Sequence, residues 1–152
     1  MKKNSVHIPQ FLIPAFLVAL ILIFSCDKKN DQGEGIIPNV YVNFTIFPYT
    51  IDFIAMGNYA YFNDHGYRGV IVYRMDQDIF YAYERTCPFD AGKDCAQVEV
   101  EVSNITVVDS CCMSVYSLLD GSPITGPSTL PLKRYRIQHN VGNGSITIIN
   151  TP

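Results

Sequence analysis

Apolar and polar residues alternate along several short segments of the chain between residues 40 and 149. In Val40–Phe47, the apolar residues Val40, Val42, Phe44 and Ile46 alternate with Tyr41, Asn43 and Thr45. A period of two is typical of a β-strand with one buried face. The other segments that we expect to form strands are Ile51–Met56, Tyr59–Phe62, Gly69–Arg74, Ile79–Arg85, Gln97–Val102, Asn104–Val108, Lys133–Gln138 and Ser145–Ile149. None of them keeps a helical period, so the pattern predicts an all-β domain.

Turn-forming residues separate these expected strands. Met75–Asp78 lies between two of them and predicts a hairpin whose second strand leads directly to Cys87. Asn140–Gly144 predicts a second hairpin near the end of the chain. In Gln97–Val102, the valines at 98, 100 and 102 are expected to face the core and the intervening residues the solvent. The sequence contains no internal repeat.

The first 25 residues have the features of an export signal. Lys2 and Lys3 precede an apolar run, Phe11–Phe24, which is interrupted only by Pro14 and is short for a membrane span. The run ends in Ile-Phe-Ser before Cys26, which resembles the processing site of a bacterial lipoprotein. We therefore expect residues 1–25 to be a signal peptide and Cys26 to be lipidated. The alternative is an uncleaved membrane anchor with a chance cysteine.

A polar segment follows Cys26 and includes Asp27–Gly35. This composition cannot form a packed core, so residues 26–38 are expected to be a tether and residues 39–152 the folded domain. On this interpretation the domain is part of the bacterial cell envelope. It is held to a membrane by lipid and faces the periplasm or the cell surface.

The charge and cysteine content narrow the function classes. The full chain of 152 residues has a formal net charge of −3, and removal of Lys2 and Lys3 leaves 9 basic against 14 acidic residues, or −5. With no cluster of Lys and Arg, nucleic acid is excluded as an expected partner. Of five cysteines, four remain beyond Cys26. An even number in an exported domain suggests two disulfides, for which three connectivities are open.

Two segments carry a resemblance to a known family. Cys111-Cys112, Tyr116, Gly121, Gly126-Pro127-Ser128 and Pro131-Leu132 follow one another at offsets that resemble the second cluster-binding loop of Rieske iron–sulfur domains. Upstream, Arg85-Thr86-Cys87-Pro88-Phe89 resembles the first loop of the same family. The resemblance implies an antiparallel β-sandwich whose two loops form a tip. It also implies that the segment with Gly126, Pro127 and Pro131 closes over that tip.

At the ligand positions, however, the sequence departs from the family. The alignment places Cys87 and Asp109 at the two cysteine positions, and Phe89 and Cys112 at the two histidine positions. A Rieske centre needs two thiolates on one iron and two imidazoles on the other. His65 and His139 are expected to be ordinary surface residues. We therefore expect a degenerate site with no metal and no cofactor, and keep an atypically ligated [2Fe-2S] cluster as the alternative. An all-cysteine site for [2Fe-2S] or Zn²⁺ is a further possibility, built from Cys87, Cys95, Cys111 and Cys112.

The resemblance also suggests a pairing of the cysteines. Some Rieske domains link their two loops by a disulfide, and Cys95 and Cys111 occupy comparable positions. Cys87 and Cys112 would then remain at former ligand positions and form the second bond. These two bonds would hold the loops together without iron.

Three function classes follow from these observations. The first is a Rieske-like lipoprotein that has lost its cluster and acts as a structural or binding module for an unidentified envelope protein or ligand. The second is electron transfer through an atypical [2Fe-2S] cluster. The third is a thiol–disulfide function, which would require a lowered pKa at Cys87 or Cys112, with Lys93 as the neighbouring cation.

No constellation typical of an enzyme is present in the sequence, so we expect at most an electron-transfer or thiol-redox component. The acidic residues Asp90, Asp94, Glu99 and Glu101 are interpreted as solvated surface charges.

Overall fold

A computed structural model describes residues 37–150 of the chain. The predicted signal peptide, Cys26 and most of the tether lie outside the described residues. Within residues 37–150 the chain forms ten β-strands and no helix, so the predicted all-β class is confirmed. Accordingly, a helix long and apolar enough to cross a membrane is absent from this described part.

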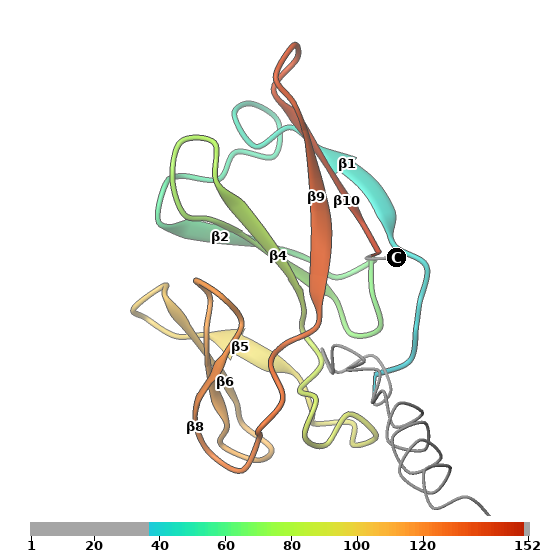
Figure 1. Ribbon diagram of the computed structural model, residues 1–152, viewed down its shortest axis with the longest axis vertical. Helices are drawn as coiled ribbons and strands as arrows, with labels where there is room; N and C mark the ends of the chain where they lie inside the picture. Colours follow the sequence, from blue (N-terminus) through green and yellow to red (C-terminus); the bar gives the residue numbers. More distant parts are fainter. Residues whose placement is uncertain (1–36, 151–152) are drawn as a thin grey trace, which may run out of the picture. The chain divides into compact units, whose positions relative to one another are not determined.

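Six strands form the larger sheet, in the order β1-β10-β9-β4-β3-β2, and every neighbouring pair is antiparallel. Figure 1 shows the long strands β9 and β10 running side by side as the closing hairpin. The bounds are β1 (Asn43–Ile46), β2 (Asn58–Phe62), β3 (Val70–Arg74), β4 (Phe80–Glu84), β9 (Arg134–Asn140) and β10 (Ser145–Ile149).

The smaller sheet contains the four strands inserted between β4 and β9, in the order β5-β6-β7-β8. It consists of β5 (Val98–Val100), β6 (Thr106–Asp109), β7 (Val115–Ser117) and β8 (Pro123–Thr125). All of its neighbouring pairs are antiparallel as well. The loop between β4 and β5, here called the first loop, and the loop between β6 and β7, the second loop, meet at one end of this insertion.

Strand β3 is buried on both faces and separates two hydrophobic cores. Val70 and Val72 pack on one side with residues of β1, β4, β9 and β10. Ile71 and Tyr73, which point the other way, pack with Tyr83 and with residues of the smaller sheet. Alternate side chains of a strand point to opposite faces, so the five-residue strand β3 contributes side chains to both cores.

Most expected strands are present. Most of these are shorter than expected, but β2 begins one residue earlier and β9 ends two residues later, at Asn140. The alternation in Val40–Phe47 matches the burial of Val42 and Ile46 and the exposure of Tyr41. Ile51–Met56 is not a strand, and that prediction was wrong: Asp52 accepts a hydrogen bond from the Phe47 amide at 2.9 Å, and the chain turns there.

Two further differences concern the smaller sheet. Val102 was expected in the core, but it is fully exposed in the turn after β5. Strands β7 and β8 were not predicted, because in the sequence they lie within a segment rich in glycine, proline and serine.

A buried carboxylate, Glu84, lies at the end of β4 next to the first loop. It accepts hydrogen bonds from the amides of Tyr67 and Arg68, from Thr86 and, at 2.7 Å, from the Tyr135 hydroxyl. These donors come from the β2–β3 connection, from the start of the first loop and from β9. Glu84 therefore fixes the direction in which the chain leaves β4 toward Cys87.

Candidate functional site

The first loop of the site leaves β4 and returns to β5. Thr86 and Gln97 pair as an isolated antiparallel bridge, and the Cys87 amide donates to the Ala96 carbonyl at 3.3 Å. These contacts close residues 87–96 into a loop whose two ends lie together. The second loop connects β6 to β7, and its Met113 amide donates to the Asp109 carbonyl at 2.7 Å.

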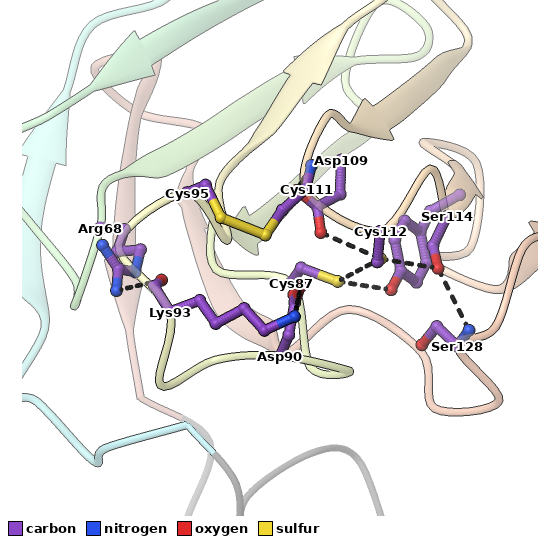
Figure 2. A network of polar contacts seen from close by, with 11 residues as sticks. Arg68, Cys87, Asp90, Lys93, Cys95, Asp109, Cys111, Cys112, Ser114 and Ser128 are labelled. Atoms are coloured by element: carbon purple, nitrogen blue, oxygen red, sulfur yellow. Dashed lines mark hydrogen bonds and ion pairs between the residues drawn. A yellow bond between two sulfur atoms is a disulfide. The ribbon is translucent and has the colours of Figure 1, made fainter.

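Four potential metal-ligating side chains converge between these loops: Cys87 and Asp90 from the first, Asp109 and Cys112 from the second (Figure 2). One donor atom of each residue lies within 4.8 Å of the others. Cys87, Asp90 and Asp109 are buried, and Cys112 is half-buried. Cys87, Asp109 and Cys112 were aligned with cluster-ligand positions in the sequence analysis, and Asp90 was not.

The two thiols of this group lie side by side. Cys87 Sγ is 3.7 Å from Cys112 Sγ and 3.1 Å from the Tyr116 hydroxyl. Cys112 Sγ is 3.0 Å from Asp109 Oδ2 and 3.1 Å from Ser114 Oγ. Each sulfur therefore has polar neighbours of its own.

The two carboxylates differ in their surroundings. Asp109 accepts a hydrogen bond from the Cys111 amide at 3.0 Å in addition to its contact with Cys112. Burial acts to raise the pKa of Asp109, but its hydrogen bonds outweigh burial and hold that pKa below the usual value. Asp90 has no hydrogen-bond partner at either carboxylate oxygen, although it is buried. Its one ion-pair contact is Lys93 Nζ at 3.5 Å, and that side chain is mostly exposed.

Of the two disulfides expected, the structure contains one. Cys95 and Cys111 are bonded, with their Cα atoms 5.4 Å apart, and they link the first loop to the second (Figure 2). The Cys87–Cys112 bond is not formed, since both are free thiols. Their sulfurs lie 3.7 Å apart, and each has polar neighbours, Tyr116 for Cys87 and Asp109 with Ser114 for Cys112. An all-cysteine metal site is also ruled out in this structure, because Cys95 and Cys111 are consumed by the disulfide.

The closing segment packs against the second loop. Gly126 has a positive φ of 98°, and the Ser128 amide donates to Ser114 Oγ at 3.1 Å. The segment ends where the Leu132 amide donates to the Gly121 carbonyl at 2.9 Å. Pro127 is exposed and Pro131 half-buried within it, and both restrict the local backbone.

The residues present do not fit a Rieske [2Fe-2S] centre. Phe89 has no donor atom, and its side chain is 50% exposed. His65 stacks on Phe44 and His139 lies in β9, so neither joins the converging group. The donors that do converge are two thiols and two carboxylates, whereas a Rieske cluster takes two thiolates and two imidazoles.

The thiol–disulfide interpretation is weakened by the environment of Cys87. Burial raises the pKa of the Cys87 thiol far above its usual value, and its hydrogen bond with Tyr116 only partly offsets that effect. A reactive cysteine needs the opposite shift. The expected cation, Lys93, contacts Asp90 instead of a sulfur.

Sequence reasoning missed Asp90, which was interpreted as a solvated charge. It is buried because the first loop turns directly after Phe89 and carries residue 90 inward while Phe89 stays exposed. Its position three residues after Cys87 was visible in the sequence, but the direction of its side chain depends on the loop conformation.

Met113 was also missed. It is 66% exposed and has a positive φ of 62°, which is uncommon for a non-glycine residue.

Comparisons with known proteins support the fold. No protein-family model and no curated protein matches the sequence. Among solved structures, a chain from a complex of reduced oxygenase and oxidized ferredoxin in carbazole 1,9a-dioxygenase is similar. It has a TM-score of 0.50 and 18% identity over 71% of this chain and 93% of that chain.

Two more solved structures are similar, with TM-scores of 0.46. The ferredoxin of carbazole 1,9a-dioxygenase from Nocardioides aromaticivorans IC177 is 19% identical, over 74% of this chain and 97% of that chain. A protein described as an NADH-dependent nitrite reductase small subunit from Mycobacterium tuberculosis is 18% identical, over 75% of this chain and 99% of that chain. At this level of identity such similarities concern the fold alone. The chain therefore contains a Rieske-like all-β domain, as the two loop segments of its sequence predicted.

Proposed function

We propose that this chain is a non-enzymatic, Rieske-like module of the bacterial cell envelope that has lost the Rieske cluster and contacts an envelope protein through its tip. The observation that carries the proposal is Phe89. It stands at a histidine ligand position, has no donor atom, and exposes half of its side chain. An exposed aromatic side chain without a donor atom can contact a partner protein but cannot bind a metal ion.

Two features support a tip that keeps its shape without a Rieske cluster. The Cys95–Cys111 disulfide links the loops covalently. The Ser128 amide and Ser114 hydroxyl join the closing segment to the second loop at 3.1 Å. In a Rieske domain the cluster itself is a cross-link between the loops, and these contacts perform the same mechanical task here.

The contact surface that we propose consists of Phe89 from the first loop and Met113 from the second. Phe89 and Met113 are 50% and 66% exposed, and each is next in the chain to a member of the converging group, Phe89 to Asp90 and Met113 to Cys112. Large exposed apolar side chains on ordered loops are typical anchors of protein–protein contacts. The left-handed backbone at Met113 is a further indication, since such strain is concentrated at functional positions.

The envelope location is the part of the proposal that rests on sequence. The signal-peptide pattern, Ser25 before Cys26, and the polar residues after it support a lipid anchor at Cys26. A tether of about a dozen residues would allow the tip to reach a partner near the membrane.

The absence of a Rieske cluster is tested by anaerobic purification of the full chain, followed by visible absorption spectroscopy and analysis of iron and acid-labile sulfide. We expect neither iron–sulfur absorption bands nor stoichiometric iron. Two irons and two sulfides per chain, with the visible spectrum of a [2Fe-2S] centre, would overturn the proposal and favour electron transfer.

The contact surface is tested by placing a photo-crosslinking amino acid at position 89 in living cells. We expect a discrete cross-linked envelope protein from position 89. Position 41 is the matched control, because Tyr41 is an aromatic residue that is 81% exposed and precedes β1. Equal cross-linking from the two positions, or none from position 89, would contradict a specific contact at the tip.

A further inference from the structure

We propose that Cys87, Asp90, Asp109 and Cys112 bind a single divalent transition-metal ion of the Zn²⁺ type, as a closed site with four protein ligands. This inference goes beyond the proposed contact function, because it concerns a metal ion that would link the first loop to the second. It depends neither on the lipid anchor nor on a partner. The proposed site differs from a Rieske centre in its donors and in holding one metal ion.

The spacing of the donor atoms suits one ion. A tetrahedral ion with metal–sulfur bonds of about 2.3 Å places two sulfur ligands about 3.8 Å apart. Cys87 Sγ and Cys112 Sγ are 3.7 Å apart. All four donor atoms lie within 4.8 Å of one another, which places the two carboxylates beside the two sulfurs.

Asp90 supplies the independent indication of a ligand. Its side chain is only 4% exposed, and neither of its oxygens has a hydrogen-bond partner. A buried carboxylate without partners is costly, and native proteins almost always satisfy such a group. Lys93 does not provide full compensation, because its ammonium lies 3.5 Å away on a side chain that is 62% exposed. A metal ion at the centre of the group would satisfy Asp90 directly.

The two neighbouring carboxylates also favour a cation placed between them. Asp90 and Asp109 are buried in the same group, and in the described residues Lys93 is the one basic side chain that forms an ion pair there. Arg85, a buried base near the first loop, is already paired with Glu99. Arg68 donates to the backbone carbonyls of Lys93 and Asp94. A divalent ion between the two carboxylates would attract both, and because two thiol protons leave as it binds, the net charge of the site would stay the same.

The donor types favour zinc over the alternatives. Thiolates select Zn²⁺ and other borderline or soft ions, while the hard ions Mg²⁺ and Ca²⁺ take oxygen alone. Four protein ligands are typical of a structural zinc site. Binding would form two metal–sulfur and two metal–oxygen bonds, and the two thiol protons would leave to solvent.

Groups around the four ligands are arranged to orient them. The Tyr116 hydroxyl lies 3.1 Å from Cys87 Sγ, and Ser114 Oγ lies 3.1 Å from Cys112 Sγ. The Cys111 amide occupies Asp109 Oδ1 at 3.0 Å, and Oδ2, which accepts from the Cys112 thiol at 3.0 Å, becomes free for the ion when that thiol loses its proton. Such hydrogen-bonding partners of the ligands are a regular feature of protein metal sites.

The test uses the full chain, purified in detergent under anaerobic conditions, freed of metal with a chelator, and titrated with Zn²⁺ or Co²⁺. We expect one Zn²⁺ per chain and a rise in thermal stability. With Co²⁺ we expect the visible bands of a tetrahedral ion together with sulfur-to-cobalt charge-transfer absorption. Saturation without charge-transfer absorption, or no binding, would overturn the proposal. Iron with sulfide in the protein as isolated would instead point to a cluster and contradict the contact function as well.

The matched variants are Asp90→Asn and Asp94→Asn, since both acids lie in the first loop and Asp94 is exposed. We expect Asp90→Asn to weaken Zn²⁺ binding about 10-fold or more, and Asp94→Asn to leave it unchanged. Equal affinities in the two variants would exclude Asp90 from the site. Cys112→Ser should remove the part of the sulfur-to-cobalt charge-transfer absorption that comes from Cys112. This variant tests the site even if Asp90→Asn is unstable. Finding Cys87 and Cys112 joined in a disulfide in protein from acid-quenched cells would also overturn the proposal.

Discussion

A Cβ atom added to Gly126 would lie 2.5 Å from Ser114 Cα. The backbone of the closing segment is therefore in direct contact with the backbone of the second loop. Ser114 in turn lies 3.1 Å from the sulfur of Cys112 and accepts a hydrogen bond from the Ser128 amide. This contact ties the position of Cys112 to the closing segment.

Gly126→Ala should destabilise the domain by roughly 1–3 kcal/mol, because alanine is strained at a φ of 98° and its methyl group meets backbone. Urea unfolding of the full chain measures the change. Gly92→Ala is the control, since nothing lies within 4 Å of a Cβ at Gly92. Equal stability of the two variants would mean that the closing segment moves away from Ser114 without cost.

Glu84→Gln should also lower the stability, by roughly 1–3 kcal/mol. The Glu84 carboxylate accepts from several donors at once, including the Tyr135 hydroxyl at 2.7 Å, and an amide NH₂ group would face some of those donors. Glu101→Gln, at an exposed position, should change the free energy of unfolding by less than about 0.5 kcal/mol. A loss confined to Glu101→Gln would contradict the assignment of Glu84 as the support of the first loop.

Removal of the disulfide with Cys95→Ser and Cys111→Ser together should cost about 3 kcal/mol. The bond closes a loop with a sequence separation of 16 residues, and its loss restores conformational freedom to the unfolded chain. Denaturant unfolding of the double variant checks the value. No change would show that the other contacts of the tip already restrict the two loops.

Stability should fall at alkaline pH. Burial raises the pKa of Tyr61 to about 12 from a usual value of 10.0, against the opposing effect of the hydrogen bond from the Val100 amide. Burial also raises the pKa of Tyr83 and of Tyr135. A raised folded-state pKa means that the stability is fully present below pH 10.0 and is lost as the pH rises toward 12.

The measurement is the free energy of unfolding between pH 9 and 11.5. Tyr61→Phe should reduce its pH dependence in this window, because one group with a raised pKa is removed. Tyr41→Phe, at a position that is 81% exposed, serves as the control. A pH dependence identical in wild type and Tyr61→Phe would show that Tyr61 ionises equally in both states.

Cys26→Ala should release the protein from the membrane or block its processing, because acylation requires the thiol. Membrane fractionation and intact mass of the wild-type protein and the variant test this prediction. Unchanged membrane retention together with unchanged mass would instead favour the uncleaved anchor.

The pattern of residues along the chain was enough to predict the all-β class and the positions of most strands in the sequence. Alternation in Val40–Phe47 and in the β3 and β4 segments reflects a strand whose neighbouring side chains face opposite environments, and this period is a local property. The spacing of Cys87, Cys112 and the glycine turns identified the Rieske-like fold, because turns and close approaches need particular residue types wherever the rest of the chain lies.

Which side chains meet at the tip could be seen only in the folded structure. Asp90 looks like a solvated acid in the sequence, and its burial beside Asp109 follows from the meeting of two loops that are distant in the chain. Pairing of Cys95 with Cys111, and contact without a bond between Cys87 and Cys112, likewise depend on where those loops meet. Distances between loops are set by the packing of whole sheets against two cores, so no local pattern of residues contains them.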